Sequence, residues 1–317
     1  MTQNAGLSSQ RDAYGEALLE LAQKNERVLA LTADLASSTR IEKFARFFPE
    51  RFFNVGVAEQ NAVAVAAGLA LEGFIPFLSS FAVFLPGRCF DQIRVAVCQN
   101  KANVKLIGSH LGFSNSGDGA SAQSVADIAL MRSLPGMVVL SPADANEAKE
   151  AVFAMASYQG PVYLRLSRSK TPLLTQRGKE FKIGQATILC PGEKLTILGT
   201  GPILAKAMAV ADVLGAEVIN CATIKPLDKE TIIMSVKKTG RALVLEEHSF
   251  LGGLGAVAAE LLSQECPVPM KLMGIPDVFG ESARDLEELY QKYGLTEERI
   301  REEGEKLVKH TGYNGIR

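Results

Sequence analysis

Glu59 is the side chain whose position in this sequence most clearly predicts chemistry. It follows an apolar segment, 52–56, that predicts a β-strand, and it precedes an alanine-rich run, 62–71, that is typical of a closely packed helix. A carboxylate held where a strand passes into a helix can exchange a proton with a bound ligand. A glutamate in a first helical turn is also stabilised by the helix dipole alone, so a solvated surface role is the alternative.

Two phenylalanines, Phe81 and Phe84, follow the next predicted strand at a spacing of three residues. Their flat apolar faces could stack on an uncharged heteroaromatic ring. The same spacing on a helix is also typical of an aromatic stripe in a protein core, so both interpretations stand at this point.

Polar side chains come directly after three other predicted strands. The loop 108–123 contains His110 and Asp118, while Asp34 and Arg168 end two further strands. Loops at the carboxyl ends of parallel strands are where such sheets bind ligands. His110 could instead be a structural histidine, and Asp34 could cap the helix that follows it.

The elements that must position these residues alternate along the whole chain. Short β-branched or aromatic runs are separated by longer helical patterns, which predicts mostly parallel sheets covered by helices. A polar, turn-rich stretch divides the α/β chain into a first domain at 1–178, a linker at 179–194 and a second domain at 195–317. The predicted strands are 27–32, 52–56, 74–79, 103–109, 137–141, 161–166, 195–199, 216–220, 241–246 and 268–273.

Composition excludes several classes of function. Of the 317 residues, 34 are basic and 35 acidic, and the two kinds are interspersed, so no nucleic-acid-binding face is predicted. The five cysteines are widely spaced and lack histidine partners at metal-ligand spacing, which indicates core residues in a reducing compartment. The longest apolar stretch is too short to cross a bilayer and no signal peptide is recognisable, so we expect no membrane partner and a cytoplasmic location.

The segment around Glu59 carries a resemblance to a known family. Phe-Asn-Val-Gly-Val-Ala-Glu-Gln-Asn, at 53–61, followed by Ala-Ala-Gly-Leu-Ala, at 66–70, resembles the pyrimidine-domain signature of the transketolase family. The family's glutamate contacts N1′ of the aminopyrimidine of thiamine diphosphate and activates that cofactor. The resemblance implies a thiamine-diphosphate pyrimidine-binding domain followed by a transketolase C-terminal domain, and it covers nearly the whole chain.

The resemblance also implies a role for each candidate residue. Glu59 and His110 would be catalytic, and Phe81, Phe84 and Asp34 would lie at the cofactor. His110 and Asp118 match ligands of the sugar hydroxyls. Residues that match phosphate contacts are Arg168, Arg11 and Ser38 of the transketolase pattern and Arg88 of the related deoxyxylulose phosphate synthases.

Part of the family pattern is altered or missing in this chain. Gly117 stands where relatives carry Glu, Ser121 where they carry Thr, and Ala122 where many carry a second His. The sequence therefore does not predict which sugar is the substrate. Gly117-Asp118-Gly119 with Asn146 has the spacing of a diphosphate and Mg²⁺ motif, but Asn146 lies at a helix start rather than in the loop after the strand. We therefore predict no metal ligand in this chain, and expect an N-terminal transketolase subunit to hold the diphosphate and Mg²⁺ in an α₂β₂ assembly.

These features predict a subunit of a transketolase that moves a two-carbon ketol unit from a ketose phosphate to an aldose phosphate. Three alternatives remain at this point: the β subunit of a 2-oxoacid dehydrogenase, an enzyme similar to deoxyxylulose phosphate synthase, and a non-catalytic regulatory paralogue. Ser109-His110 and Ser167-Arg168 favour a sugar phosphate over a 2-oxo acid.

Overall fold

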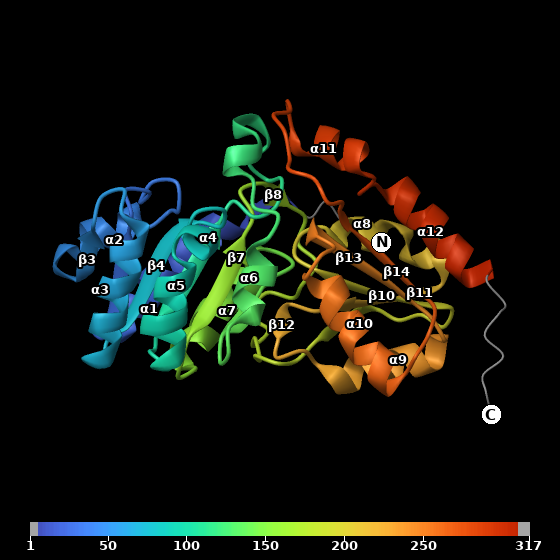
Figure 1. The fold of residues 1–317 in the computed structure, drawn as a ribbon, viewed down its shortest axis with the longest axis horizontal. Helices are drawn as coiled ribbons and strands as arrows, with labels where there is room; N and C mark the ends of the chain where they lie inside the picture. The colour runs from blue at the N-terminus through green and yellow to red at the C-terminus, as the bar shows by residue number, and fades with distance from the viewer. Residues whose placement is uncertain (1–5, 310–317) are drawn as a thin grey trace.

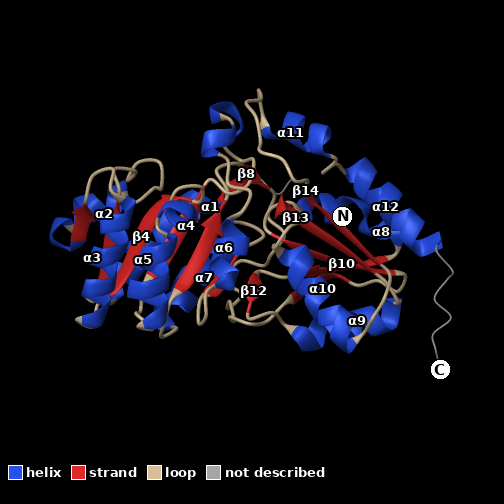
Figure 2. Cartoon of the chain, in the orientation of Figure 1, coloured by secondary structure: helices blue, strands red, loops and turns tan. Residues whose placement is uncertain are grey.

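The computed structural model describes residues 6–309, which form two lobes side by side, each built around its own β-sheet (Figure 1). The first lobe contains a seven-stranded sheet and the second a five-stranded sheet. Helices cover both faces of the strands (Figure 2). The predicted α/β fold with mostly parallel sheets is therefore confirmed.

The first sheet has the strand order β12-β6-β7-β5-β4-β2-β3, and all its pairings are parallel except that of β12 with β6. Strands β2, β4, β5 and β7 are neighbours in its centre. All but β12 correspond to strands that the sequence predicts. The strands are β2 (Val28–Thr32), β3 (Phe52–Asn54), β4 (Ile75–Phe81), β5 (Lys105–Ser109), β6 (Val138–Leu140), β7 (Val162–Leu166) and β12 (Thr223–Lys225).

The two faces of this sheet bury different helices, because successive side chains of a strand point to opposite sides. In β2, Val28 and Ala30 pack toward α1 (Gln10–Lys24) and α7 (Ala145–Ser157). Leu29 and Leu31 pack toward the other face. That face is covered by α3 (Glu59–Leu71), α4 (Leu85–Arg88), the π-helix η2 (Ile93–Gln99) and α6 (Asp127–Ser133).

The second sheet has the strand order β14-β13-β10-β11-β9, with β9 alone antiparallel to its neighbour. One face packs against α8 and α12, and the other against α9 and α10. The elements are β9 (Thr187–Cys190), β10 (Leu195–Thr200), β11 (Ala216–Asn220), β13 (Ala242–Ser249), β14 (Met270–Ile275), α8 (Leu204–Leu214), α9 (Lys229–Thr239), α10 (Leu254–Glu265), α11 (Leu286–Tyr293) and α12 (Glu297–Lys309).

Several short strands differ from the sequence prediction. Strand β9 lies inside the segment 179–194, for which the sequence predicts a linker, and β12 leaves the second lobe to pair with β6 of the first. Strands β1 (Ser8–Ser9) and β8 (Lys170–Thr171) pair with each other outside both sheets. All four are short edge strands, whose pairing depends on distant partners more than on local propensity. Within 6–309, no helix combines the length and apolarity that a membrane span requires.

Buried charges join the two lobes. Asp127 of α6 accepts two hydrogen bonds from Arg165 of β7, at 2.8 and 2.9 Å. Arg165 also donates to the backbone oxygen of Glu247 in β13, at 3.3 Å. The Glu247 carboxyl in turn accepts from the Phe113 backbone N–H, at 2.8 Å, and from the Tyr290 hydroxyl. Burial raises the pKa of Glu247 to about 7.

We expect Glu247→Gln to make stability less dependent on pH. Because the folded-state pKa is raised from 4.5 to about 7, wild-type stability from this group is complete below pH 4.5 and is lost as the pH rises through 7. The full loss corresponds to about 3 kcal/mol. The amide introduced by this substitution can still accept from the Phe113 N–H and donate to the Tyr290 oxygen, so only the titration is removed.

Urea unfolding between pH 5 and pH 8.5 measures this difference. Glu265→Gln, at the end of α10, is the matched control because the Glu265 carboxyl makes no hydrogen bond or ion pair within the described residues. A Glu247→Gln curve that falls with pH as steeply as the wild-type curve contradicts the assignment.

Candidate active site

Four of the predicted site residues follow strands at the carboxyl edge of the first sheet. Phe81 is the last residue of β4 and His110 directly follows β5. Asp34 and Arg168 each come two residues after a strand, β2 and β7 respectively. These four strands are parallel neighbours, so their carboxyl ends lie side by side.

Glu59 is the first residue of α3, and its carboxylate is only 3% exposed. Its Oε2 accepts a hydrogen bond from Nη1 of Arg88, at 2.8 Å, and the two side chains form an ion pair. Gln60 donates to the backbone oxygen of Arg88, at 2.9 Å, which fixes the end of α4 against the start of α3. The carboxylate is thus nearly dry and is held in one orientation.

Phe81 and Phe84 form a stacked pair, which Arg88 links to the Glu59 carboxylate. Their ring centroids are 5.5 Å apart and the planes differ by 15°. The Arg88 guanidinium that pairs with Glu59 lies over the Phe84 ring, 4.6 Å from its centroid. On the other side, Phe81 contacts His110 with a centroid separation of 3.9 Å.

The position of Arg88 indicates which kind of ligand these residues fit. Its guanidinium is flat, donates an N–H to Glu59 and lies against the face of Phe84. A protonated aminopyrimidine presents the same two features, an N–H donor and a flat π surface. Glu59 and Phe84 could therefore contact an aminopyrimidine ring as they contact this guanidinium.

His110 is held in a strained backbone conformation with φ of 64°, which non-glycine residues rarely adopt and which is typical of functional sites. Its Nδ1 lies 2.8 Å from the Ser109 hydroxyl and its Nε2 lies 3.5 Å from Arg11. Burial, together with the charges of Arg11, Arg168 and Arg40, lowers the pKa of His110 to about 3. The imidazole is therefore neutral and can donate one hydrogen bond and accept another.

Arg11 and Arg168 form a positively charged cluster next to His110. Arg11 donates to the backbone oxygens of Ser38, at 2.6 Å, and of Arg168, at 3.3 Å. Burial and the neighbouring charges of Arg40 and Arg168 lower the pKa of Arg11 to about 10. Asp12 neutralises Arg40, at 2.9 Å, but does not pair with Arg11 or Arg168. Such a cluster favours an anionic ligand.

The structure does not bring three predicted residues into this cluster. Arg88 pairs with Glu59 instead of lying beside the other arginines. Asp34 is exposed and exchanges hydrogen bonds with Asn54, at 3.0 and 3.1 Å. Asp118 is exposed in the short 3₁₀-helix η3 (Ser116–Asp118), and among the described residues no hydrogen bond or ion pair joins it to His110.

One buried residue at the site is missing from the sequence prediction. Asn115 is 1% exposed, and its Oδ1 accepts a hydrogen bond from Nη1 of Arg168, at 2.7 Å. The only signal in the sequence is the position of Asn115 in the loop 108–123. An asparagine in a loop is ordinarily a turn residue, so its type does not distinguish it.

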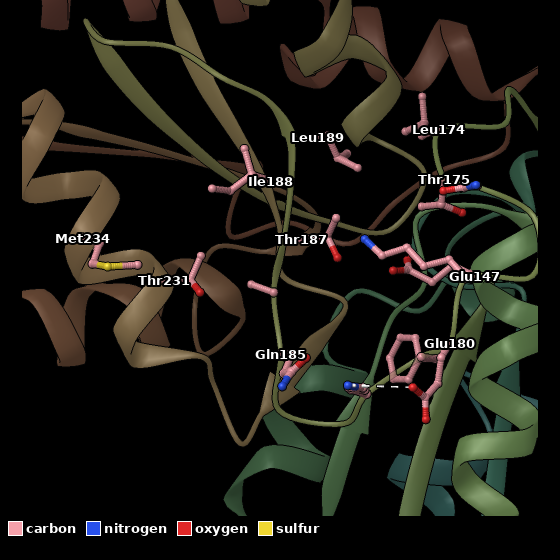
Figure 3. Close-up of a pocket in the computed structure, with 15 residues that line it drawn as sticks. Glu147, Leu174, Thr175, Glu180, Gln185, Thr187, Ile188, Leu189, Thr231 and Met234 are labelled. Atoms are coloured by element: carbon pink, nitrogen blue, oxygen red, sulfur yellow. Dashed lines mark ion pairs between the residues drawn. The ribbon is translucent and has the colours of Figure 1, made fainter.

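A cavity of about 510 Å³ is lined by other residues (Figure 3). It is formed by Glu147 of α7, the segment 174–189, and Thr231 and Met234 of α9, and none of the predicted site residues lines it. In the described part of the chain, no group of three or more His, Cys, Asp or Glu side chains could hold a metal ion.

Comparison with known proteins assigns the family. Residues 8–172 match the model of the transketolase pyrimidine binding domain, and residues 184–300 match that of the transketolase C-terminal domain. The chain is thus of the class in which these two domains follow one another, and it belongs to the transketolase family. The predicted family is confirmed, and thiamine diphosphate is the cofactor that this family implies.

Three relatives match over nearly their whole length. The chain is 41% identical over 295 residues to the 6-deoxy-6-sulfo-D-fructose transketolase subunit SqwH of Clostridium sp. strain MSTE9, covering 92% of this chain and 91% of that protein. It is 36% identical over 308 residues to an apulose-4-phosphate transketolase subunit of Phocaeicola vulgatus, covering 94% of this chain and 97% of that protein. A solved structure described as a split gene transketolase, inactive beta4 tetramer, superposes with a TM-score of 0.88 at 44% identity, covering 96% of this chain and 99% of that chain.

We expect the His110 imidazole to stay neutral between pH 8 and pH 5. Its pKa of about 3 lies below the ordinary 6.5 because the buried ring faces arginine charges, so stability from the neutral ring is complete above pH 6.5 and is lost as the pH falls toward 3. The ring ¹⁵N shifts, followed by NMR in the intact chain, should remain those of a neutral imidazole. A titration midpoint between pH 6 and pH 7 contradicts the buried, arginine-flanked position.

Proposed function

We propose that this chain is the subunit of a two-chain transketolase that carries the pyrimidine-binding and C-terminal domains. The complete enzyme would move a two-carbon ketol unit from an anionic ketose to an aldose. The observation that carries this proposal is the buried Glu59 carboxylate at the start of α3, which the Arg88 guanidinium links to the stacked rings of Phe84 and Phe81. The match of residues 8–172 to the transketolase pyrimidine binding domain also supports the proposal.

A partner subunit would complete the enzyme. The matched domains are the pyrimidine-binding and C-terminal ones. Two of the relatives are named as transketolase subunits, and the third is described as a split gene transketolase. We infer that the partner carries the diphosphate-binding domain and holds the diphosphate with Mg²⁺. Because closed two-fold symmetry is the common arrangement of oligomers, two copies of each chain are the proposed assembly.

The residues of this chain would bind and orient the reactants. Bound thiamine diphosphate supplies an electron sink for breaking and re-forming the carbon–carbon bond next to a carbonyl. Glu59 would hold a proton at the pyrimidine N1′, and Phe81 and Phe84 would pack against the ring. The neutral His110 would hydrogen-bond a sugar hydroxyl, since it can serve as donor or acceptor. Asp34 and Asp118 remain predicted contacts of the cofactor and the donor sugar.

An anionic sugar is the substrate class that the site favours. Arg11, which donates to the Ser38 backbone oxygen, and Arg168 give the surroundings of His110 an excess of positive charge. The names of the two relatives specify a sulfonated sugar in one case and a sugar phosphate in the other. Both carry a tetrahedral oxyanion, which planar guanidinium groups bind well.

We expect Glu59→Gln to reduce kcat for ketol transfer by about 100-fold or more in the complex reconstituted with its partner, because a neutral amide cannot exchange the N1′ proton. A coupled spectrophotometric assay with xylulose 5-phosphate or a sulfonated ketose as donor measures it. Thiamine diphosphate binding is measured in parallel to show that the site is intact.

Glu72→Gln is the matched control, since Glu72 caps the opposite end of the same helix and is exposed. It should leave kcat unchanged. Undiminished ketol transfer in Glu59→Gln, or turnover of pyruvate alone by the wild-type complex, contradicts the proposed function.

A further inference from the structure

Asn115 presents a buried hydrogen-bond donor without a partner. Its side chain is 1% exposed, and among the described residues no acceptor contacts its Nδ2. Only the amide oxygen can accept from a guanidinium, so the 2.7 Å contact with Arg168 determines which end of the amide is the NH₂ group. A buried donor left unpaired costs about 1–3 kcal/mol, so native structures rarely retain one without a reason.

The loop that carries Asn115 is fixed before any ligand arrives. The Leu111 N–H donates to the Leu166 oxygen of β7, at 3.1 Å. Ser114 closes the turn through its hydroxyl, which donates to the Leu111 oxygen at 2.6 Å and accepts from the Arg168 N–H at 3.3 Å. The position of the free NH₂ group is therefore set by contacts between the segments that follow β5 and the end of β7.

Arg11 contributes a second buried donor of the same kind. Its Nη1 and Nη2 donate to the backbone oxygens of Ser38 and Arg168, but its Nε is buried and has no acceptor within 6–309. Hydrogen bonds thus connect Asn115, Arg168 and Arg11 into one network, which continues through the 3.5 Å contact to His110. This network presents unused N–H groups together with excess positive charge.

We propose that Asn115 is a ligand-binding residue, and that its Nδ2 and the Arg11 Nε, with Arg168, bind the terminal phosphate or sulfonate of the sugar. The inference rests on the proposed function and adds a specificity-determining residue to it. The amide suits both tasks: its oxygen orients Arg168, and its NH₂ group donates to the anion. A carboxylate in the same place would also orient Arg168, but it would repel the anion.

The first test uses the isolated full-length chain, with inorganic phosphate and methanesulfonate as probes. Each is titrated at constant ionic strength, and binding is followed by calorimetry. Phosphate binding alone assigns the site to phosphate esters, and binding of both assigns it to phosphates and sulfonates. If the wild-type chain binds neither probe, the proposal is wrong.

Asn115→Asp is the decisive variant, because it keeps the acceptor for Arg168 while replacing the donor by a negative charge. We expect it to weaken binding of the probe about tenfold or more, or at least about 1.4 kcal/mol. Asn103→Asp is the matched control: the Asn103 oxygen accepts from the Gly160 N–H, at 3.2 Å, near the opposite end of β5. Equal affinity in Asn115→Asp and the wild type overturns the proposal.

NMR of the wild-type chain gives a measurement that does not depend on how the variant folds. Addition of the bound probe should shift the side-chain NH₂ resonances of Asn115 and the Nε–H resonance of Arg11. The side-chain resonances of Asn103 should stay in place. Unshifted Asn115 resonances at saturating probe contradict direct contact.

The reconstituted enzyme separates this inference from the proposed function. Asn115→Asp should raise KM for the anionic ketose about tenfold or more with little change in kcat, and should leave turnover of the same ketose without its terminal anion unchanged. A fall in kcat with unchanged KM contradicts a role in anion binding. If the complex transfers no ketol unit at all, the proposed function fails, while the titrations of the isolated chain still decide the role of Asn115.

Discussion

The parallel pairing of β2, β4, β5 and β7 is the constraint on which the candidate active site depends. Because the four strands run in one direction, their carboxyl ends meet at one edge, and side chains from distant parts of the sequence become neighbours. The strand ends also force the chain to turn sharply. At His110 this turn requires a left-handed conformation, which the hydrogen bond between Leu111 and Leu166 helps to hold.

Much of this arrangement follows from local sequence signals. The central strands are short, mostly apolar runs, and the first turn of α3 is marked by a strand, a glutamate and an alanine-rich helix in succession. Since parallel strands place their following loops on one edge, Glu59, Phe81, His110 and Arg168 can be assigned to one region from chain position alone. The residue types then indicate the kind of ligand, because few other side chains can exchange a proton as a carboxylate does, stack as a flat ring does or bind an anion as a guanidinium does.

The remaining features depend on contacts that no local pattern encodes. The direction of the long Arg88 side chain is set by the Glu59 carboxylate and the Phe84 ring, so matching its position to a phosphate ligand does not predict its contacts. Asn115 is recognisable only from its burial and its bond to Arg168. Strand β12 is not predicted from the sequence for a similar reason, since its partner β6 belongs to the other lobe and lies far earlier in the chain.

The ion pair between Arg88 and Glu59 has a consequence for the stability of the folded chain. A carboxylate buried to 3% exposure without a counter-charge would destabilise the folded chain by several kcal/mol. Arg88 supplies the counter-charge from within the same chain, and its own side chain is 46% exposed. The chain therefore compensates the charge of this buried carboxylate by itself, without a residue from any second polypeptide.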